Sequence, residues 1–514
     1  MTALHSPSNI PGPATVRVTL DNALRLNIRE LQSTHREMLE RIRADMVLDN
    51  PEYLELIRLG KRAWGVPEKI ALYQFDRKTK DLILPRGYQA GLLSHLVEAD
   101  LVWEISDQTV AGDPVKYPRQ AELRDYQEEP VRAALDAREG VIVAPTGAGK
   151  TVVGLGIVGR LGRKALWVTH TIDLAQQTLA AAETHLGLAG YQLGLIGDGK
   201  RQVGSHLTVG LVQTLGQQPL QDWPGLEGVG IVILDEAHHC PARTFREVIA
   251  ASPARYRIGL TATPKRADGL EPVLYSVMGP TIAEVTSHEL MDLDRILKPV
   301  VIPVKTGAKF AFERDLKQAL RDAEIQRREG IEPRKVDPDS ADGFNDVLAR
   351  LSDDEARNQI ISELVSCECL AGHSVLVLSP RINHLETLYE MLVWRLGPEP
   401  IRILTGQTRG RDEIIQAARR GDIRVLLATQ LADEGLDIPV LDRLVLAMPK
   451  RAGSKAIQQI GRILRPAPGK TDAVVYDLVD DVGVLLSQWR SRRREYLARG
   501  FEVREFMHPG RGLT

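Results

Sequence analysis

Short apolar runs alternate with longer helical or polar stretches along most of the chain after residue 115. Such runs are typical of buried strands, and their alternation with helices is typical of a parallel α/β sheet. The first series of runs comprises Val141–Val143, Ala165–Val168, Leu207–Leu211, Ile231–Leu234 and Arg257–Leu260. The second series comprises Val375–Leu378, Ile401–Leu404, Val425–Ala428, Leu444–Leu446 and Ala473–Tyr476. The pattern therefore predicts two consecutive parallel-sheet domains of one architecture, over residues 116–297 and 298–485.

Residues 1–115 have a different pattern. Apolar positions alternate from Ala14 to Ile28 around the turn residues Asp21 and Asn22, which predicts a β-hairpin. The helices and strands expected after it are Glu30–Met46, Pro51–Arg62, Ile70–Phe75, Asp81–Leu84 and Gly87–Ala99. We therefore predict a small N-terminal α+β domain. Its basic residues either contact nucleic acid or form a solvated charged surface.

Two charged segments accompany the second sheet. Ala308–Arg357 is helical in pattern, with a break rich in proline and aspartate, and predicts an inserted helical arm at about 308–357. The last segment, 486–514, is basic: Gln488–Arg511 holds seven arginines and three glutamates. It is either a DNA contact or a basic helix packed on the second domain.

Composition limits the class of protein. The 514 residues allow several domains, and 43% hydrophobic with 26% charged residues is typical of a soluble globular chain. The net charge of −2 gives the chain no overall positive charge to attract nucleic acid, so any basic surface that binds nucleic acid must be local. The first thirteen residues contain no apolar segment, so we expect neither a signal peptide nor a membrane anchor. Three cysteines indicate a reducing cytoplasm, and their spacing predicts no structural metal.

The stretch from Gly140 to Thr151 joins a predicted strand to a predicted helix through a glycine-bearing loop. Such a junction directs backbone N–H groups and a helix N-terminus at one point, where a polyphosphate can bind. Gly147 and Gly149 allow close approach, because a Cβ there would block the phosphates. Lys150 can reach the β- and γ-phosphates, and the Thr151 hydroxyl can ligate Mg²⁺. The segment predicts a site for a nucleoside triphosphate.

An apolar strand beginning at Ile231 ends in two acids. At the carboxyl end of a strand beside a phosphate loop, Asp235 can hold Mg²⁺, and Glu236 can orient and activate the attacking water. The next residues, Ala237 and His238, complete a specific tetrapeptide. We interpret His239 as a structural or surface residue.

Other polar positions suit the same chemistry. The Gln127 amide can make two hydrogen bonds to an adenine edge. Thr261 and Thr263 end another strand, and their hydroxyls can link the acidic pair to a moving neighbour. Arg462 and Arg465 lie three residues apart, which predicts one face of a helix, and guanidinium groups stabilise charge on a transferring phosphoryl group. A plain strand end and a solvated arginine pair are the alternatives.

Together these segments resemble a known family. Ala144–Thr151, Asp235–His238, Thr261–Thr263 and Gln458–Arg465 resemble motifs I, II, III and VI of the superfamily 2 helicases, in order and on the expected elements. Fainter similarities to the Q motif and to motifs Ia, IV and V extend the resemblance over roughly residues 120–480; these lie at Leu123–Gln127, Thr169–Gln176, Ser379–Arg381 and Thr429–Asp437. Gly259–Gly269 and Ile460–Pro466 look most like the branch that holds type III restriction translocating subunits, XPB-type helicases and phage UvsW-type helicases.

The resemblance implies a role for each matched position. The implied catalytic residues are Lys150, Asp235, Glu236, Arg462 and Arg465, with Thr151 and Asp235 holding Mg²⁺. The implied ATP-binding residues are Arg124, Gln127, Thr146, Gly147, Ala148, Gly149, Lys150, Thr151, Gly435, Asp437 and Gln458. His238, Thr261 and Thr263 are implied to couple ATP hydrolysis to movement. The implied nucleic-acid contacts are Thr169, His170, Gln213, Thr214, Ser379, Arg381 and Thr429.

The fold implied is α/β, with two tandem RecA-like parallel-sheet domains that bind ATP between them. The implied activity is an ATP-dependent DNA helicase or translocase that acts on single-stranded, duplex or forked DNA, in repair, recombination or phage defence. Two alternatives stay open: an RNA helicase, and an ATP-switched DNA clamp that recruits a nuclease partner without unwinding. The sequence predicts no membrane partner and does not predict an oligomeric state.

Overall fold

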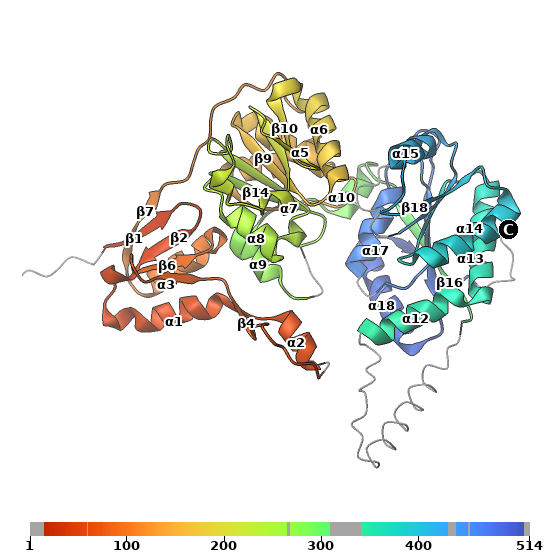
Figure 1. The fold of residues 1–514 in the computed structure, drawn as a ribbon, viewed down its shortest axis with the longest axis horizontal. Coiled ribbons are helices and arrows are strands. Elements are labelled where there is room, and N and C mark those ends of the chain that lie inside the picture. Colours follow the sequence, from red (N-terminus) through yellow and green to blue (C-terminus); the bar gives the residue numbers. More distant parts are fainter. Residues whose placement is uncertain are drawn as a thin grey trace, which may run out of the picture. The chain divides into compact units, whose positions relative to one another are not determined.

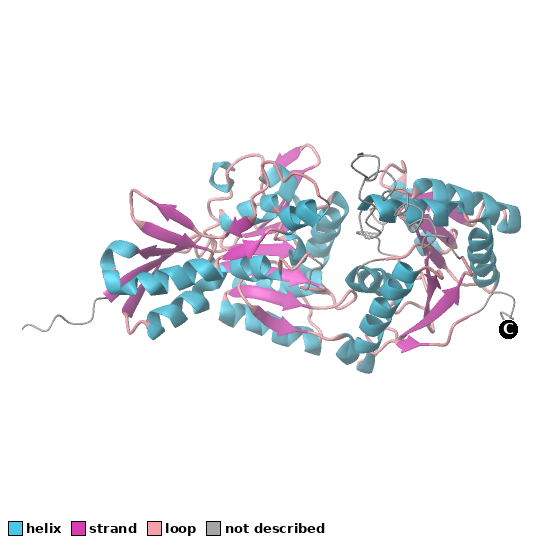
Figure 2. Ribbon diagram, turned by 90° about the horizontal axis from the view of Figure 1, so that it is seen from below, coloured by secondary structure: helices cyan, strands magenta, loops and turns pink. Residues whose placement is uncertain are grey.

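A computed structural model shows the fold of the chain (Figure 1). It describes residues 15–58, 60–264, 268–308, 341–429, 438–450 and 453–507. The chain divides into two compact units, the first built largely from residues up to Glu284 and the second largely from Val285 onward. In each unit, helices pack against the faces of a parallel sheet (Figure 2). No helix in the described ranges has both the length and the apolar character needed to cross a membrane.

The N-terminal part of the first unit is a five-stranded sheet in the order β5-β6-β2-β1-β7. The predicted hairpin is confirmed, since β1 and β2 pair antiparallel with Val18 opposite Leu26. The strands are β1 (Thr15–Leu20), β2 (Leu24–Asn27), β5 (Gln74–Asp76), β6 (Asp81–Leu84) and β7 (Val102–Asp107). Helices α1 (Arg36–Asp45) and α3 (Gln89–Glu98) supply Ile42 and Leu92 to its core. Alternate strand positions are buried because successive side chains point to opposite faces.

One predicted strand of this region is divided in two. Residues 70–75 were expected to be continuous, but β4 (Lys69–Ala71) and β5 are separate. β4 pairs with β3 (Val47–Asp49) in a small second sheet, and α2 (Pro51–Arg58) connects these two strands. Leu72 leaves the strand path to pack on the N-terminal core, so tertiary packing overrides the local β pattern.

The first α/β sheet has eight strands in the order β11-β10-β12-β9-β13-β14-β8-β15. The five predicted strands all form: β8 (Glu139–Val143), β9 (Ala165–Thr169), β12 (Leu207–Leu211), β13 (Ile231–Asp235) and β14 (Tyr256–Thr261). Three were not predicted: β10 (Leu193–Gly197), β11 (Lys200–Gln202) and β15 (Thr281–Glu284). The helices are α4 (Asp125–Ala137), α5 (Lys150–Leu161), α6 (Ile172–Leu186), α7 (Val212–Leu215), α8 (Arg243–Ala250) and α9 (Glu271–Met278). All pairings are parallel except β10 with β11, so the strand ends that carry the motifs share one edge.

The N-terminal sheet packs directly on this α/β sheet. Arg86 is buried and donates from Nε to a carboxylate oxygen of Glu139 at 3.0 Å and from Nη1 to the Ala254 carbonyl at 2.7 Å. The next residue is Gly87, where a Cβ would lie 2.2 Å from the Tyr275 carbonyl oxygen. Only glycine permits so close an approach to α9. The two sheets therefore form one compact unit.

The second unit has a seven-stranded parallel sheet in the order β18-β19-β17-β20-β21-β16-β22. The predicted strands form as β17 (Val375–Leu378), β18 (Ile401–Leu404), β19 (Val425–Ala428), β20 (Arg443–Leu446) and β21 (Ala473–Val479); β16 (Pro299–Lys305) and β22 (Glu502–Val503) were not predicted. The helices are α10 (Ser287–Asp292), α12 (Ala341–Asp353), α13 (Glu355–Leu370), α14 (Ile382–Leu396), α15 (Arg411–Arg420), α17 (Gly453–Ile460) and α18 (Gly483–Ala498). Of the expected helical arm at about 308–357, residues 309–340 lie outside the described residues, and the rest forms α12 and the start of α13.

Helix α18 crosses the domain boundary expected between residues 485 and 486 and packs on the second sheet. Its Arg492 side chain is buried and donates to both carboxylate oxygens of Asp477 on β21, at 2.9 and 2.8 Å. Tyr496, one turn later, donates its hydroxyl to the same carboxylate at 2.9 Å. The pKa of Arg492 is raised, because the attraction of Asp477 outweighs the effect of burial. For these residues the structure shows a packed helix rather than a free basic tail.

We predict that Arg492→Met lowers the free energy of unfolding by about 3–5 kcal/mol, because it leaves the Asp477 carboxylate buried without a counter-charge. Chemical denaturation followed by fluorescence measures the change. Arg493→Met, at the exposed neighbouring position, is the matched control and is expected to have little effect. An equal loss in both variants would show that the buried pair is not the cause.

Candidate nucleotide and nucleic-acid site

The predicted phosphate loop lies between β8 and α5. Gly147 and Gly149 have φ of 93° and 77°, a left-handed conformation that favours glycine. Thr146 and Ala148 alternate with them, and Lys150 and Thr151 are the first residues of α5. The loop therefore ends at a helix N-terminus, where backbone N–H groups are unsatisfied and attract anions.

The acidic pair follows β13 on the same edge of the sheet. Asp235 is 5% exposed and accepts a hydrogen bond from the Glu236 backbone N–H at 2.9 Å. Glu236 has φ of 47°, which is uncommon for a residue with a side chain and is typical of functional sites. The Lys150 ammonium lies 4.0 Å from a Glu236 carboxylate oxygen. The structure thus brings together three of the predicted catalytic residues.

Burial and the neighbouring negative charge of Glu236 together raise the pKa of Asp235 to about 6. The positive charge of Lys150 opposes both effects. A carboxylate in this position gains from a cation beside it. The donor set fits Mg²⁺, which binds through one or two carboxylates and keeps several waters.

The predicted coupling residues His238, Thr261 and Thr263 lie next to one another, beside the acidic pair. His238 Nδ1 lies 3.2 Å from the Thr261 hydroxyl and 3.4 Å from Glu236 Oε2. The Thr261 hydroxyl donates to the Thr263 carbonyl at 3.1 Å. The end of β14 is therefore connected to the acidic pair through one histidine.

His239, which we interpreted from the sequence as a structural or surface residue, belongs to this group. Its ring lies with its centroid 4.2 Å from that of His238 and 4.5 Å from that of His170, a predicted nucleic-acid contact. It also stacks on Phe245 at 5.7 Å. Gln213 in turn donates its amide to the His170 carbonyl at 3.3 Å. Only the proximity of three strand ends joins these residues, which no local motif reveals.

The predicted nucleic-acid residues fall into two groups. Gln213 is exposed, and His170, Thr214 and Arg381 are partly exposed. The side chains of Thr169, Ser379 and Thr429 are at most 7% exposed. Contacts of this second group with a phosphate backbone would therefore have to come from main-chain groups in this conformation.

Ser379 has an internal role. Its hydroxyl accepts from the Arg381 backbone N–H at 3.2 Å and lies 3.0 Å from His384 Nδ1. His384 Nε2 lies 2.9 Å from the Asn358 amide oxygen. Burial, with the nearby positive charges of Arg357 and Arg381, lowers the pKa of His384 to about 3, so this ring is neutral. The sequence pattern did not indicate His384.

The predicted adenine contact begins α4. Gln127 is buried, and its side-chain oxygen accepts from the Arg124 backbone N–H at 3.0 Å, as in a capping box. The Arg124 guanidinium donates to the Tyr126 hydroxyl at 3.2 Å. A two-bond contact between Gln127 and an adenine edge would require this cap to open.

The motif residues of the second unit are only partly on one helix. Gln458 lies in α17, but Arg462 lies in the 3-10 turn Gly461–Ile463 and Arg465 follows its end. The prediction of one helical face for both arginines is therefore wrong, because the α-helix ends before glycine and tightens into a 3-10 turn. Gly435 and Asp437 lie outside the described residues, as do residues 265–267 within Gly259–Gly269.

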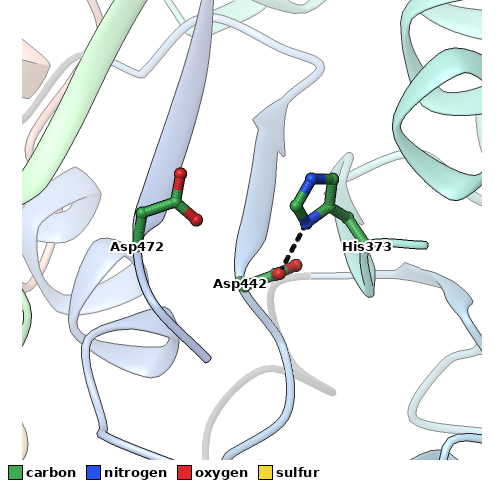
Figure 3. Close-up of side chains that lie close together, drawn as sticks. All are labelled: His373, Asp442 and Asp472. Carbon is green, nitrogen blue, oxygen red and sulfur yellow. Dashed lines mark hydrogen bonds and ion pairs between the residues drawn. The ribbon is translucent and has the colours of Figure 1, made fainter. Parts of the chain in front are cut away.

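A separate cluster lies where β17, β20 and β21 begin. This is the edge of the second sheet opposite to the strand ends that precede Ser379 and Thr429. It contains His373, Asp442 and Asp472, whose polar atoms lie within 4.8 Å of one another (Figure 3). The guanidinium of Arg443 donates to Asp472 at 2.8 Å and lies 2.8 Å from His373 Nε2. This guanidinium supplies the positive charge that the acids need, so the cluster is an ion-pair network.

We predict that Asp235→Asn raises the free energy of unfolding of the metal-free protein at pH 7.5 by about 1–3 kcal/mol. The folded-state pKa of about 6 exceeds the unfolded value of 3.8, so the folded state binds more protons between these values. The wild type therefore loses stability as pH rises from about 4 to 6, whereas the variant lacks this component. Thermal unfolding across that range, with Asp222→Asn at an exposed position as control, measures the difference. A variant no more stable than the wild type at pH 7.5 would contradict the conclusion that ionised Asp235 destabilises the metal-free folded protein.

Comparisons with known proteins identify relatives of both α/β domains. Residues 120–266 match the family "Type III restriction enzyme, res subunit", and residues 356–467 match the helicase conserved C-terminal domain. The chain is 29% identical over 372 residues to the DNA 3′-5′ translocase XPB2 of Sulfurisphaera tokodaii, covering 67% of this chain and 79% of that protein. It is 27% identical over 406 residues to a protein of Escherichia phage T5 named as a helicase, covering 78% and 81%. The structure of Dbp5 from S. cerevisiae, solved with RNA and ADP BeF3, shares the fold with a TM-score of 0.53 at 17% identity, covering 74% of this chain and 89% of that one. The two matched segments make the chain similar, in this order, to the two RecA-like domains of the superfamily 2 helicases.

Proposed function

We propose that this protein is a motor that hydrolyses ATP to move along DNA and to unwind or remodel duplex or branched DNA. The observation that carries the proposal is the meeting of Lys150, Asp235 and Glu236 beside a glycine loop that ends at a helix N-terminus. Positioning and charge stabilisation are the main requirements of phosphoryl transfer, and these groups supply both.

Each residue has a proposed part in the ATP cycle. The loop Thr146–Gly149 and Lys150 hold the phosphates, and Thr151 and Asp235 hold Mg²⁺, which neutralises charge on the phosphate oxygens. Glu236 orients and activates the attacking water. Gln458, Gly435 and Asp437 belong to the same nucleotide site, and Arg462 and Arg465 stabilise charge on the transferring phosphoryl group.

We favour DNA over RNA as the nucleic acid along which the protein moves. The relative with the highest similarity reported above is named a DNA translocase, whereas the RNA-bound Dbp5 structure shares only the fold. Contacts by Thr169, His170, Gln213, Thr214, Ser379, Arg381 and Thr429 would address the phosphate backbone, so we expect little sequence specificity and strong salt dependence. A cytoplasmic location fits the three free cysteines.

The direct test is ATP hydrolysis without nucleic acid and with single-stranded DNA, duplex DNA, forked DNA or RNA. We expect DNA to stimulate the rate about tenfold or more, and Lys150→Ala to reduce it roughly 10²-fold or more because charge stabilisation of the phosphates is lost. Strand displacement is measured beside it. Hydrolysis without displacement would favour a clamp that recruits a nuclease, and stimulation by RNA alone would contradict the DNA assignment.

We predict that His238→Ala keeps basal ATP hydrolysis within about threefold but abolishes most of its stimulation by DNA. The imidazole joins Glu236 to Thr261 and touches the His239 ring, so it lies between the acidic pair and the predicted nucleic-acid residues. His185→Ala, on α6, is the control. Equal loss of basal and stimulated rates would show that His238 acts in hydrolysis itself rather than in coupling.

A further inference from the structure

A cavity of about 310 Å³ lies within the first unit, between the N-terminal sheet and the α/β sheet. Its walls come from β2, β6 and the residues after β4 on one side, and from α8, β14 and α9 on the other; Figure 1 shows these elements side by side. Four arginines line it: Arg25, Arg86, Arg246 and Arg257. A single acid, Glu247, is among the lining residues, but Arg25 is paired with Asp21 at 2.8 Å and Arg86 with Glu139 at 3.0 Å. The walls therefore carry a small excess of positive charge.

Arg257 is the most unusual of these residues, because it is buried without a carboxylate partner. Its side chain is 1% exposed, and it donates to the carbonyls of Ser252 at 2.8 Å, Val277 at 3.2 Å and Asn22 at 3.4 Å. Its buried Nε has no hydrogen-bond partner. Across the described parts of the chain no acidic oxygen lies within 4 Å of its guanidinium. A buried charge of this kind normally has a partner.

The surrounding charges do not balance it. Arg86, also buried, shares the interface and is paired with Glu139 at 3.0 Å, so two guanidinium groups face one carboxylate. Burial and the positive charge of Arg86 lower the pKa of Arg257 to about 9, although the negative charge of Glu139 opposes them. The carbonyls at the ends of α8 and α9 offset part of the charge, because the C-terminus of a helix is negative. They leave the region one positive charge in excess.

The other lining residues indicate what kind of anion fits. Tyr73, Leu72 and Pro85 form an apolar wall, and the amides of Asn22 and Gln74 offer hydrogen bonds. Ligand sites of about this volume are typically apolar with a few placed polar groups. The excess guanidinium charge favours phosphate, whose oxygens match the planar fork of arginine.

The cavity is separate from the nucleotide site. Arg257 and Glu139 lie at the starts of β14 and β8, whereas the phosphate loop and Thr261 follow the ends of the same two strands. In a parallel sheet these are opposite edges. A ligand here would contact both the N-terminal domain and the ATP-binding domain without entering the ATP site.

We propose that this cavity is a second binding site, which takes a small organic phosphate: a phosphate group carrying an aromatic or apolar portion. The phosphate lies among the arginines, and the organic portion lies against Tyr73 and its apolar neighbours. Because the walls belong to two domains, the ligand holds the N-terminal domain on the ATP-binding domain. This inference does not depend on the DNA motor activity.

The test is calorimetric titration of the full-length protein, with its nucleotide site first saturated with ADP and Mg²⁺. The probes are phenyl phosphate and inorganic phosphate. We expect one phenyl phosphate per chain, bound about tenfold or more tightly than inorganic phosphate, and a rise in the thermal midpoint with its concentration.

The variants compare two arginines on α8. Arg246 lines the cavity and is partly exposed, so Arg246→Glu should fold and weaken phenyl phosphate binding tenfold or more. Arg243, three residues earlier, is exposed, paired with Glu247 at 2.7 Å, and not part of the cavity wall, so Arg243→Glu should bind as wild type does.

Three results would overturn the proposal. The first is absence of phenyl phosphate binding at millimolar concentration, and the second is equal weakening by both variants, which would indicate a general surface-charge effect. The third is equal affinity for the two probes, which would show that the aromatic or apolar portion of the ligand does not contribute to binding. ATP hydrolysis is not the readout, so failure here leaves the proposed motor activity untouched.

Discussion

The negative charge of Asp235 is the constraint on which the first unit depends. Its carboxylate is buried at the end of β13, next to the second acid Glu236. The positive charge of Lys150 and a hydrogen bond from the Glu236 backbone N–H offset only part of this cost. Such a site is unfavourable when empty, since burial and like charge both oppose ionisation. A cation bound there with a polyphosphate would relieve that cost, so its free energy of binding would be available to reorganise the residues in contact with the acids. His238 and Thr261 are the first of these.

Contact between the N-terminal sheet and the α/β sheet has a direct consequence for function. Arg86, Glu139 and Gly87 make this interface polar, buried and close-packed. Removal of residues 1–115 would leave Glu139 and Arg257 without the groups that now cover them. A truncated protein would therefore test the stability of the ATP-binding domain as much as it tests recognition of DNA, and point substitutions in the cavity walls are the cleaner probe.

The second unit uses buried ion pairs for a different purpose. Arg492 with Asp477 fixes α18 on β21, and Arg357 with Asp480, at 2.8 Å and both fully buried, fixes the start of α13. A buried pair adds little net stability over an apolar pair, but it strongly disfavours arrangements that separate the two charges. These pairs therefore specify where two helices lie on the sheet that also carries Ser379 and Thr429.

The sequence by itself determined the two parallel sheets, ten of their strands, and the places of the predicted phosphate loop and acidic pair at the ends of β8 and β13. It succeeded there because β-branched runs and glycine-bearing junctions have local physical causes, and because parallel strands bring their carboxyl ends to one edge. Only the tertiary structure decided the rest. β10 contains two glycines and β16 two prolines, so each forms a strand through its neighbours rather than through its own propensity. Burial of Arg257, the hydrogen bond between His384 and Asn358, and the ring contact of His239 with His170 depend on residues distant in the chain. The chemistry of one residue cannot reveal which distant neighbours it will contact.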